Sequence, residues 1–160
     1  MPDRTDVLII GAGLAGLFLA LRLAPRRCMV ICPQPLGQAA SSAWAQGGLA
    51  AALSPEDSAE EHASDTIAAG DGLVDPVTAL LIARDGPARV HDLLKLGVPF
   101  DRTPEGALAL SLEAAHSRPR VARVAGDLAG KAIMEAISKA AIASEHIRIR
   151  SGLKAVSLLQ

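Results

Sequence analysis

The hydrophobic pattern predicts a strand, a helix and a second strand at the start of the chain. Residues 6–10, DVLII, form a continuous apolar run that is typical of a parallel strand buried on both faces. Residues 17–24, LFLALRLA, are good helix formers, and this helix should end near Pro25. Residues 28–33, CMVICP, predict the second strand. With the glycine-rich turn between them, these segments make a βαβ unit.

Serine and proline then predict the start of a second helix. The segment from Gln34 through residue 51 is expected to be a loop. In SPED at 54–57, Ser54 has the character of a helix cap and Pro55 suits the first turn. We expect this helix to run to about Ala69, directly before a glycine.

The next helical pattern contains a helix-breaking pair. Asp75 and Pro76 predict a new helix start, and apolar positions recur at helical spacing after it. Gly86 and Pro87 should interrupt this helix. A further helix is therefore expected over about 87–96, ending at Gly97.

The last third of the chain predicts a turn, a loop and a long helix. The turn lies at 103–106, and a short extended segment and a loop bearing arginine and histidine follow it. The long helix should open near Asp127, for which N-capping is the simplest role. Residues 147–160 predict one or two strands. Because the chain reaches Gln160 on an apolar run, we expect the intact polypeptide to be longer.

The first turn carries a G-x-G-x-x-G pattern between a strand and a helix. Gly11 permits the tight turn, Gly13 lets backbone approach a pyrophosphate, and Gly16 lets the helix pack close to the strand. The phosphate charge would lie at the positive end of the helix. The pattern therefore predicts dinucleotide binding; a tight turn without a ligand is the alternative.

The end of the second strand departs from the usual fingerprint. An acidic residue normally lies about 20 residues after the turn and binds ribose hydroxyls. Here Pro33 and Gln34 occupy that region, although the Gln34 amide still offers a donor and an acceptor. At this point the choice between NAD and FAD stays open.

Composition excludes several classes of function. Half of the 160 residues are apolar, so the chain can form one hydrophobic core. Its 16 basic and 17 acidic residues nearly balance and give no reason to expect a nucleic-acid partner. There is no signal peptide pattern and no apolar span long enough for a membrane, so we expect a cytosolic protein. Cys28 and Cys32 are expected to be buried free thiols. His62, His91 and His146 have no partner at ligand spacing, so a metal site is not expected.

Three segments together carry a family resemblance. DVLIIGAGLAGLFLALRLA, SSAWAQGGLAA and EAAHSRPRVARVAGDLAG, in this order, resemble the L-aspartate oxidase family, the soluble branch of the succinate dehydrogenase and fumarate reductase flavoproteins. The resemblance implies an α/β fold: a Rossmann-like FAD-binding domain with a parallel sheet and flanking helices. Residues 1–160 would be its N-terminal portion, and the capping and C-terminal helical domains would lie outside this chain.

The resemblance also implies where the cofactor binds. In the family, the A-Q-G-G loop runs along the flavin ring, which suits Gly47 and Gly48 because backbone N–H groups reach the ring only where side chains are small. Ser41 stands where the membrane-associated members carry the histidine that binds flavin covalently, so FAD should be noncovalent here. Trp44 either packs beside the ring or anchors the loop in the core. The expected cofactor-binding residues are Gly11, Ala12, Gly13, Leu14, Ala15, Gly16, Gln34, Ser41, Ser42, Ala43, Trp44, Ala45, Gln46, Gly47 and Gly48.

The third segment contains the candidate catalytic residues. Glu113 matches the glutamate that the family places near the substrate ammonium, and His116 in the same segment either faces the substrate or bonds locally. Arg118, Arg120 and Arg123 are either partners for substrate carboxylates or members of a solvated face.

The activity implied by the resemblance is flavin-dependent oxidation of L-aspartate to iminoaspartate. The acceptor would be oxygen, giving hydrogen peroxide, or fumarate, and the product would pass to quinolinate synthase as the first step of de novo NAD biosynthesis. Two alternatives stay open: a soluble fumarate reductase or succinate dehydrogenase flavoprotein, and a catalytically incomplete FAD-domain fragment. No nucleic-acid or membrane partner is expected.

Overall fold

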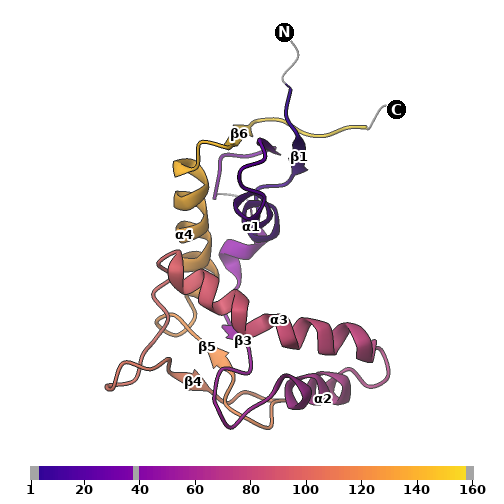
Figure 1. Ribbon diagram of the computed structural model, residues 1–160, viewed down its shortest axis with the longest axis vertical. Coiled ribbons are helices and arrows are strands. Elements are labelled where there is room, and N and C mark those ends of the chain that lie inside the picture. Colours follow the sequence, from indigo (N-terminus) through magenta and orange to yellow (C-terminus); the bar gives the residue numbers. More distant parts are fainter. Residues whose placement is uncertain (1–3, 38–39, 158–160) are drawn as a thin grey trace. The chain divides into compact units, whose positions relative to one another are not determined.

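The protein is described here by a computed structural model that covers residues 4–37 and 40–157 (Figure 1). The chain forms two compact units. Unit 1 contains Met1–Ala45 and Gly130–Gln160, and unit 2 contains Gln46–Ala129. Each unit has its own sheet, so the two are considered separately.

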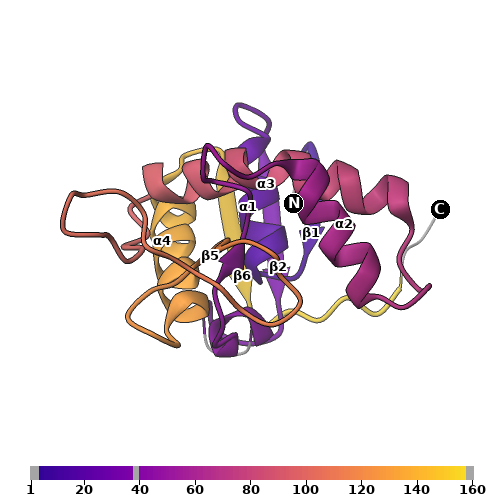
Figure 2. The same cartoon turned by 90° about the horizontal axis from the view of Figure 1, so that it is seen from below.

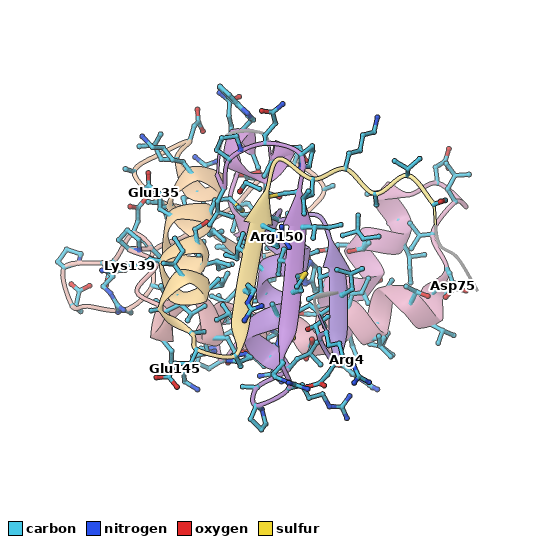
Figure 3. The ribbon with its side chains drawn as sticks, turned by 90° about the horizontal axis from the view of Figure 1, so that it is seen from above. Arg4, Asp75, Glu135, Lys139, Glu145 and Arg150 are labelled. Atoms are coloured by element: carbon cyan, nitrogen blue, oxygen red, sulfur yellow. The ribbon has the colours of Figure 1, made fainter. Side chains whose placement is uncertain are left out.

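Unit 1 is built on a parallel sheet of three strands in the order β1-β2-β6 (Figure 3). Its elements are β1 (Val7–Ile10), α1 (Leu14–Arg22), β2 (Cys28–Cys32), the 3-10 helix η1 (Ser41–Trp44), α4 (Ala129–Ala143) and β6 (Ile147–Ser151). Cys28 on the central strand pairs with Val7 on one side and Ile147 on the other. The parallel sheet and its helices confirm the expected α/β class.

The buried face of unit 1 explains the apolar runs in the sequence. Leu17 and Ala20 of α1 are fully buried, as is Val30 on the central strand. Ile137 is fully buried in α4. The two cysteines of β2 are free and buried, as expected from the sequence.

Unit 2 combines a small antiparallel sheet, in the order β3-β5-β4, with two helices that pack on each other. Its elements are β3 (Leu49–Ala50), α2 (Ala59–Ala69), α3 (Pro76–Lys95), β4 (Leu110–Ser111) and β5 (Val121–Ala122). Figure 2 shows α2 and α3 side by side. Their contact is made by small side chains, with Ala63 of α2 buried among Ala79 and Ala83 of α3, so the two helices approach closely.

The predicted start of α2 at residues 54–57 is wrong. The helix begins at Ala59, and the Ser58 hydroxyl caps it by accepting a hydrogen bond from Glu61 N at 3.1 Å. Residues 54–57 form a turn instead, in which Asp57 N donates to Ser54 O at 3.1 Å. The Asp57 carboxylate accepts hydrogen bonds from Arg120, which is distant in sequence. The predicted end is confirmed, because Gly70 is the C-cap.

The predicted break at Gly86 and Pro87 is also wrong, because α3 runs through both residues. Ala79 and Ala83 before the proline are buried, and Val90 and Leu93 after it are buried at positions that continue the same helical face. Their burial offsets the roughly 3 kcal/mol that an internal proline costs. The other predictions hold: Asp75 caps the start through Thr78 N, Pro76 is the first residue, and Gly97 follows the end with φ +88°.

The remaining differences concern short elements. The expected loop after Gln34 contains η1 and β3. The long helix begins at Ala129, two residues after Asp127. The C-terminal segment forms one strand, β6, and residues 158–160 of the predicted strand region lie outside the described residues. Within the described ranges, no helix is long and apolar enough to cross a membrane.

Candidate functional site

The glycine turn of unit 1 follows directly from close packing between β1 and α1. Gly11 has φ +111°, a conformation that L side chains rarely adopt, and its N–H donates to Ile31 O at 2.9 Å. A Cβ on Gly16 would overlap the carbonyl oxygen of Gly11. Both glycines are therefore required by the path of the chain itself.

The N-terminus of α1 is left open by its own sequence. Its N-cap residue is Gly13, which has no side chain to offer, and no acidic residue lies in the first turn. The Ser42 hydroxyl lies nearby and accepts a long hydrogen bond of 3.4 Å from Leu14 N. The positive end of the helix dipole is therefore not neutralised by a carboxylate of its first turn, which suits an anionic group.

A cavity of about 280 Å³ lies beside this turn, at the carboxyl ends of β1 and β2. In open parallel sheets this is where nucleotide ligands bind. The cavity joins three sets of residues that are distant in sequence. It is lined by Gly11, Ala12, Gly13, Cys32, Pro33, Gln34, Pro35, Leu36, Gly37, Ala40 and Ser41.

Five predicted cofactor residues therefore meet at one cavity: Gly11, Ala12, Gly13, Gln34 and Ser41. Sequence reasoning missed Cys32, which it treated only as a buried thiol. The Cys32 thiol donates to Gln34 O at 3.2 Å and so shapes the end of β2. Its place about 20 residues after the turn is the signal that identifies it.

Trp44 and Ala43 line a different hollow. It has a volume of about 750 Å³ and lies within unit 1, and its wall includes Glu135 and Lys139. Figure 3 shows these two residues on α4. The Trp44 side chain is 78% exposed. The interpretation in which Trp44 anchors its loop in the core is therefore wrong, and packing beside a ligand stays a prediction.

The end of η1 is fixed by the start of α4. Gly130 N donates to Ala45 O at 3.1 Å, and a Cβ on Gly130 would overlap the carbonyl oxygens of Ser42 and Ala45. Gly130 is thus a glycine because the predicted cofactor residues 42–45 lie against its backbone.

Gln46, Gly47 and Gly48 belong to unit 2. A Cβ on Gly48 would overlap the carbonyl oxygen of Ala122 on β5, so close strand approach already explains this glycine. Gly47 has no neighbouring heavy atom within 4 Å of a built Cβ in the described structure, and Gln46 is exposed. Gly47 is therefore the better of the two glycines for close approach by a ligand.

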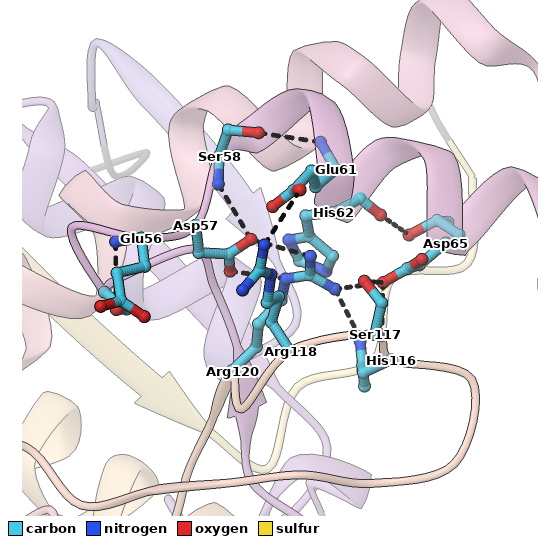
Figure 4. Close-up of polar contacts among 12 residues, drawn as sticks. Glu56, Asp57, Ser58, Glu61, His62, Asp65, His116, Ser117, Arg118 and Arg120 are labelled. Atoms are coloured by element: carbon cyan, nitrogen blue, oxygen red, sulfur yellow. Dashed lines mark hydrogen bonds and ion pairs between the residues drawn. The ribbon is translucent and has the colours of Figure 1, made fainter.

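Unit 2 contains a buried charged group that we call the Arg120 cluster: Asp57, Asp65, His116, Ser117 and Arg120 (Figure 4). Arg120 is fully buried. Its Nε and Nη2 donate to the two oxygens of Asp57 at 2.6 and 2.8 Å, and its Nη1 donates to Asp65. Both interpretations of Arg120 from the sequence are wrong: two aspartates engage the guanidinium, which is neither solvated nor free for a substrate.

Charge in this cluster is set by hydrogen bonds. The Ser117 N–H and then Arg120 hold the pKa of Asp65 well below its ordinary value. Burial of Asp57 opposes ionisation, but hydrogen bonds from Arg120 and Ser58 outweigh it and lower the pKa of Asp57. Both carboxylates are therefore ionised at neutral pH.

His62 lies next to the Arg120 cluster, a contact that the sequence did not predict. The rings of His62 and His116 are 5.5 Å apart, centroid to centroid. Burial and then the Arg120 charge lower the pKa of His62, so this ring is neutral at physiological pH. Nδ1 of His116 lies 3.5 Å from Nη1 of Arg120. Within the described ranges, no group of His, Cys, Asp and Glu side chains could hold a metal ion.

The candidate catalytic Glu113 forms an ion pair with Arg123. Arg123 donates from Nε and Nη2 to the same oxygen, Oε1, at 3.2 and 2.5 Å, and each side chain is more than a third exposed. Among the described residues, the second oxygen Oε2 accepts no hydrogen bond. Arg118 forms a weaker, exposed pair with Glu61 at 3.5 Å.

The parallel sheet, the glycine turn and the cavity at the strand ends define a Rossmann-like dinucleotide-binding protein. Residues 6–160 match the family described as FAD binding domain, and the chain belongs to this family. The match decides the choice between NAD and FAD that the end of β2 left open: the cofactor is FAD.

Named relatives agree with this family. The chain is 54% identical to the L-aspartate oxidase of Caulobacter vibrioides over 156 residues, which are 96% of this chain and 30% of that protein. It is 45% identical to the L-aspartate oxidase of Mesorhizobium japonicum over 95% of this chain and 30% of that protein. The chain thus spans less than a third of the length of these relatives.

Solved structures show the same fold. The Sdh1 complex of Mycobacterium smegmatis matches with a TM-score of 0.84 and 31% identity, over 92% of this chain and 27% of that one. Quinol fumarate reductase of E. coli matches with a TM-score of 0.82 and 25% identity, over 92% of this chain and 26% of that one.

The residues of unit 1 fit FAD. The turn needs glycine at Gly11 and Gly16 for its own packing, and the open first turn of α1 suits a pyrophosphate. Among the described residues that line the adjoining cavity, none has a charged side chain that would repel it.

Proposed function

We propose that the protein carrying this chain oxidises L-aspartate to iminoaspartate, with FAD as cofactor and oxygen or fumarate as acceptor. With oxygen the second product is hydrogen peroxide, and iminoaspartate would supply quinolinate synthase in the first step of de novo NAD biosynthesis. The observation that carries the proposal is the 54% identity to the L-aspartate oxidase of Caulobacter vibrioides over 96% of this chain. We place the activity in the cytoplasm.

The activity belongs to the intact protein, since the chain spans 30% of that relative. Residues 1–160 are proposed to form the N-terminal portion of its FAD-binding domain, with capping and helical domains in the remainder. The isolated fragment is expected to be inactive.

We assign binding of the FAD pyrophosphate to backbone N–H groups. N–H groups at Gly13, Leu14 and Ala15 would face the pyrophosphate, and Gln34 would contact the ribose. Ser41 has no nitrogen to attach to flavin, so FAD is held noncovalently. The bound flavin supplies the two-electron acceptor for the substrate.

Glu113 and Arg123 are assigned to the substrate. The two hydrogen bonds that Glu113 accepts from Arg123 occupy only its Oε1. Oε2 is then available to accept a hydrogen bond from the substrate ammonium. Because succinate has no amine, this contact would favour L-aspartate. His116 stays a candidate for a contact with the substrate.

The second candidate function is a soluble fumarate reductase or succinate dehydrogenase flavoprotein. The TM-score of 0.84 to the Sdh1 complex favours it. Ser41 and Glu113 favour the aspartate reaction.

The test uses purified intact protein. Flavin released by denaturation, without proteolysis, establishes noncovalent binding. Peroxide formation is then followed with L-aspartate, D-aspartate and succinate. Peroxide from L-aspartate alone supports the proposal, and activity on succinate without activity on L-aspartate rejects it. In a Glu113→Gln variant, selectivity for L-aspartate over succinate should fall; unchanged selectivity would reject the role of Glu113.

A further inference from the structure

The segment from Glu113 to Arg123 is fastened to α2 by side chains that lie far away in sequence. Asp57, just before α2, receives two hydrogen bonds from Arg120, and Asp65, in the second turn of α2, receives one from Arg120 (Figure 4). Asp65 also accepts hydrogen bonds from the N–H and hydroxyl of Ser117, both at 2.7 Å. Ser117 and Arg120 of the segment are thus both held by Asp65 of α2.

The chemistry of this attachment fixes geometry more than it adds stability. A buried ion pair is often no more stabilising than apolar residues of the same size, because desolvation opposes it. A guanidinium, however, offers a planar fork of donors, and Arg120 uses three nitrogen atoms on two carboxylates. Lysine has one nitrogen and cannot reproduce this arrangement.

The other end of the segment is held by the sheet. Ser111 on β4 pairs with Val121 on β5, and Arg120 N donates to Ser111 O at 3.2 Å. Glu113 lies two residues after β4, and Arg123 lies one residue after β5. Glu113 and Arg123 therefore both lie within two residues of strands whose pairing is fixed by the ladder.

We propose that Arg120 is a positioning residue: through Asp57 and Asp65 it holds the segment so that Glu113 is presented to the substrate ammonium. The proposal rests on the proposed function, since Glu113 needs a substrate amine to recognise. Arg120 itself is fully buried, and its guanidinium is engaged by Asp57 and Asp65.

The test compares the Arg120→Lys variant and the wild type, both as intact proteins, in enzyme kinetics, flavin content and hydrogen–deuterium exchange. We expect KM for L-aspartate to rise about 10-fold, with kcat within about 3-fold and flavin content unchanged, because weaker presentation of Glu113 impairs binding. Hydrogen–deuterium exchange should increase in peptides that cover residues 112–120, because Asp65, the acceptor of the Ser117 N–H, is no longer held by the Arg120 guanidinium. Asp65→Asn keeps the Asp57 pair and should show the same changes at about 3-fold in KM.

A double variant separates positioning from stability. If Arg120 acts through Glu113, adding Arg120→Lys to Glu113→Gln should raise KM no further. The matched control is Arg84→Lys, whose partner Glu60 and own side chain are both mostly exposed, and which should change neither KM nor exchange.

Three results overturn the proposal: unchanged KM in folded Arg120→Lys, additive effects in the double variant, or unchanged exchange in 112–120. Failure of the proposed function is seen separately, as absence of L-aspartate oxidation by wild type. In that case the exchange measurement decides alone: increased exchange supports the holding role of Arg120, and unchanged exchange rejects it.

Discussion

The glycine turn of unit 1 and the Arg120 cluster of unit 2 both hold a short loop in place, by opposite means. The turn depends on missing side chains, since a Cβ on Gly16 would overlap Gly11 O. The cluster depends on a large charged side chain that is fully buried between Asp57 and Asp65.

The difference determines what each region leaves for a ligand. Around the turn, the first N–H groups of α1 have no carboxylate of their own, so they are available to an anion. In the cluster, the charged groups of Arg120, Asp57 and Asp65 bond to one another, whereas the nearby pair of Glu113 and Arg123 is partly exposed. We therefore expect the stability of the turn to depend mainly on side-chain size, and the stability of the cluster to depend mainly on charge.

The largest expected effect is loss of the buried cation. Arg120→Met leaves Asp57, which is 1% exposed, without its charged partner and should cost about 4 kcal/mol of stability. Thermal or urea unfolding of the intact protein measures this. Arg84→Met, which breaks the exposed pair with Glu60, should cost less than about 1 kcal/mol. Equal losses in the two variants would contradict the importance of burial.

A steric change in unit 1 should come next. Gly16→Ala is expected to destabilise by about 2 kcal/mol, since the new Cβ forces β1 and α1 apart, and to lower flavin content. The same unfolding assay applies, with released flavin as a second readout. Gly86→Ala in α3 meets only an ordinary contact with Ala51 and should stay within about 1 kcal/mol of wild type. A stabilised Gly16→Ala variant would show that the overlap is relieved without cost.

Low pH should lower the stability of the protein by less than the removal of Arg120 does. Asp57 and Asp65 have pKa values lowered in the folded state, so their contribution to stability is present above the unfolded value of about 4 and is lost as pH falls below it. The melting temperature should therefore drop below about pH 4, and drop less steeply in Asp65→Asn. Gly16→Ala should keep the wild-type slope, and a slope unchanged in Asp65→Asn would contradict the assignment.

The smallest effect concerns the caps of the two helices. Ser58→Ala removes the hydroxyl that caps α2 and should cost about 1 kcal/mol, measured by unfolding. In contrast, Ser42→Ala removes only a 3.4 Å contact to Leu14 N and should cost less than about 0.5 kcal/mol. The reverse order would show that α1 is capped by Ser42 after all.

Local signals in the sequence were sufficient for much of unit 1. The run DVLII, the spaced glycines and the run CMVIC lie next to one another, so the strand, turn, helix and strand followed from short-range rules. The family match then confirmed FAD as the cofactor.

Errors arose where distant contacts decided local structure. The sequence analysis placed the cap of α2 at Ser54 and missed Ser58, although Glu61, three residues after Ser58, completes a capping-box pattern. Pro87 suggested a break, but burial of Val90 on the face that begins before the proline kept α3 continuous.

The Arg120 cluster was beyond sequence reasoning. Its aspartates lie 63 and 55 residues before Arg120, and no local pattern distinguishes a buried arginine from an exposed one. Glu113 was identified from a family resemblance, whereas its pairing with Arg123 emerged only from the fold. The roles of the predicted cofactor and catalytic residues stay predictions until the variants are measured.

The exposed ring of Trp44 has an optical consequence. It is the only tryptophan among the 160 residues, it is 78% exposed, and it lies three residues after Ser41, which lines the cavity beside the glycine turn. Flavins absorb light in the region where tryptophan emits, so a flavin bound in unit 1 would quench this single fluorophore by energy transfer. Residues 1–160 thus contain an intrinsic fluorescent reporter of flavin binding that needs no added label.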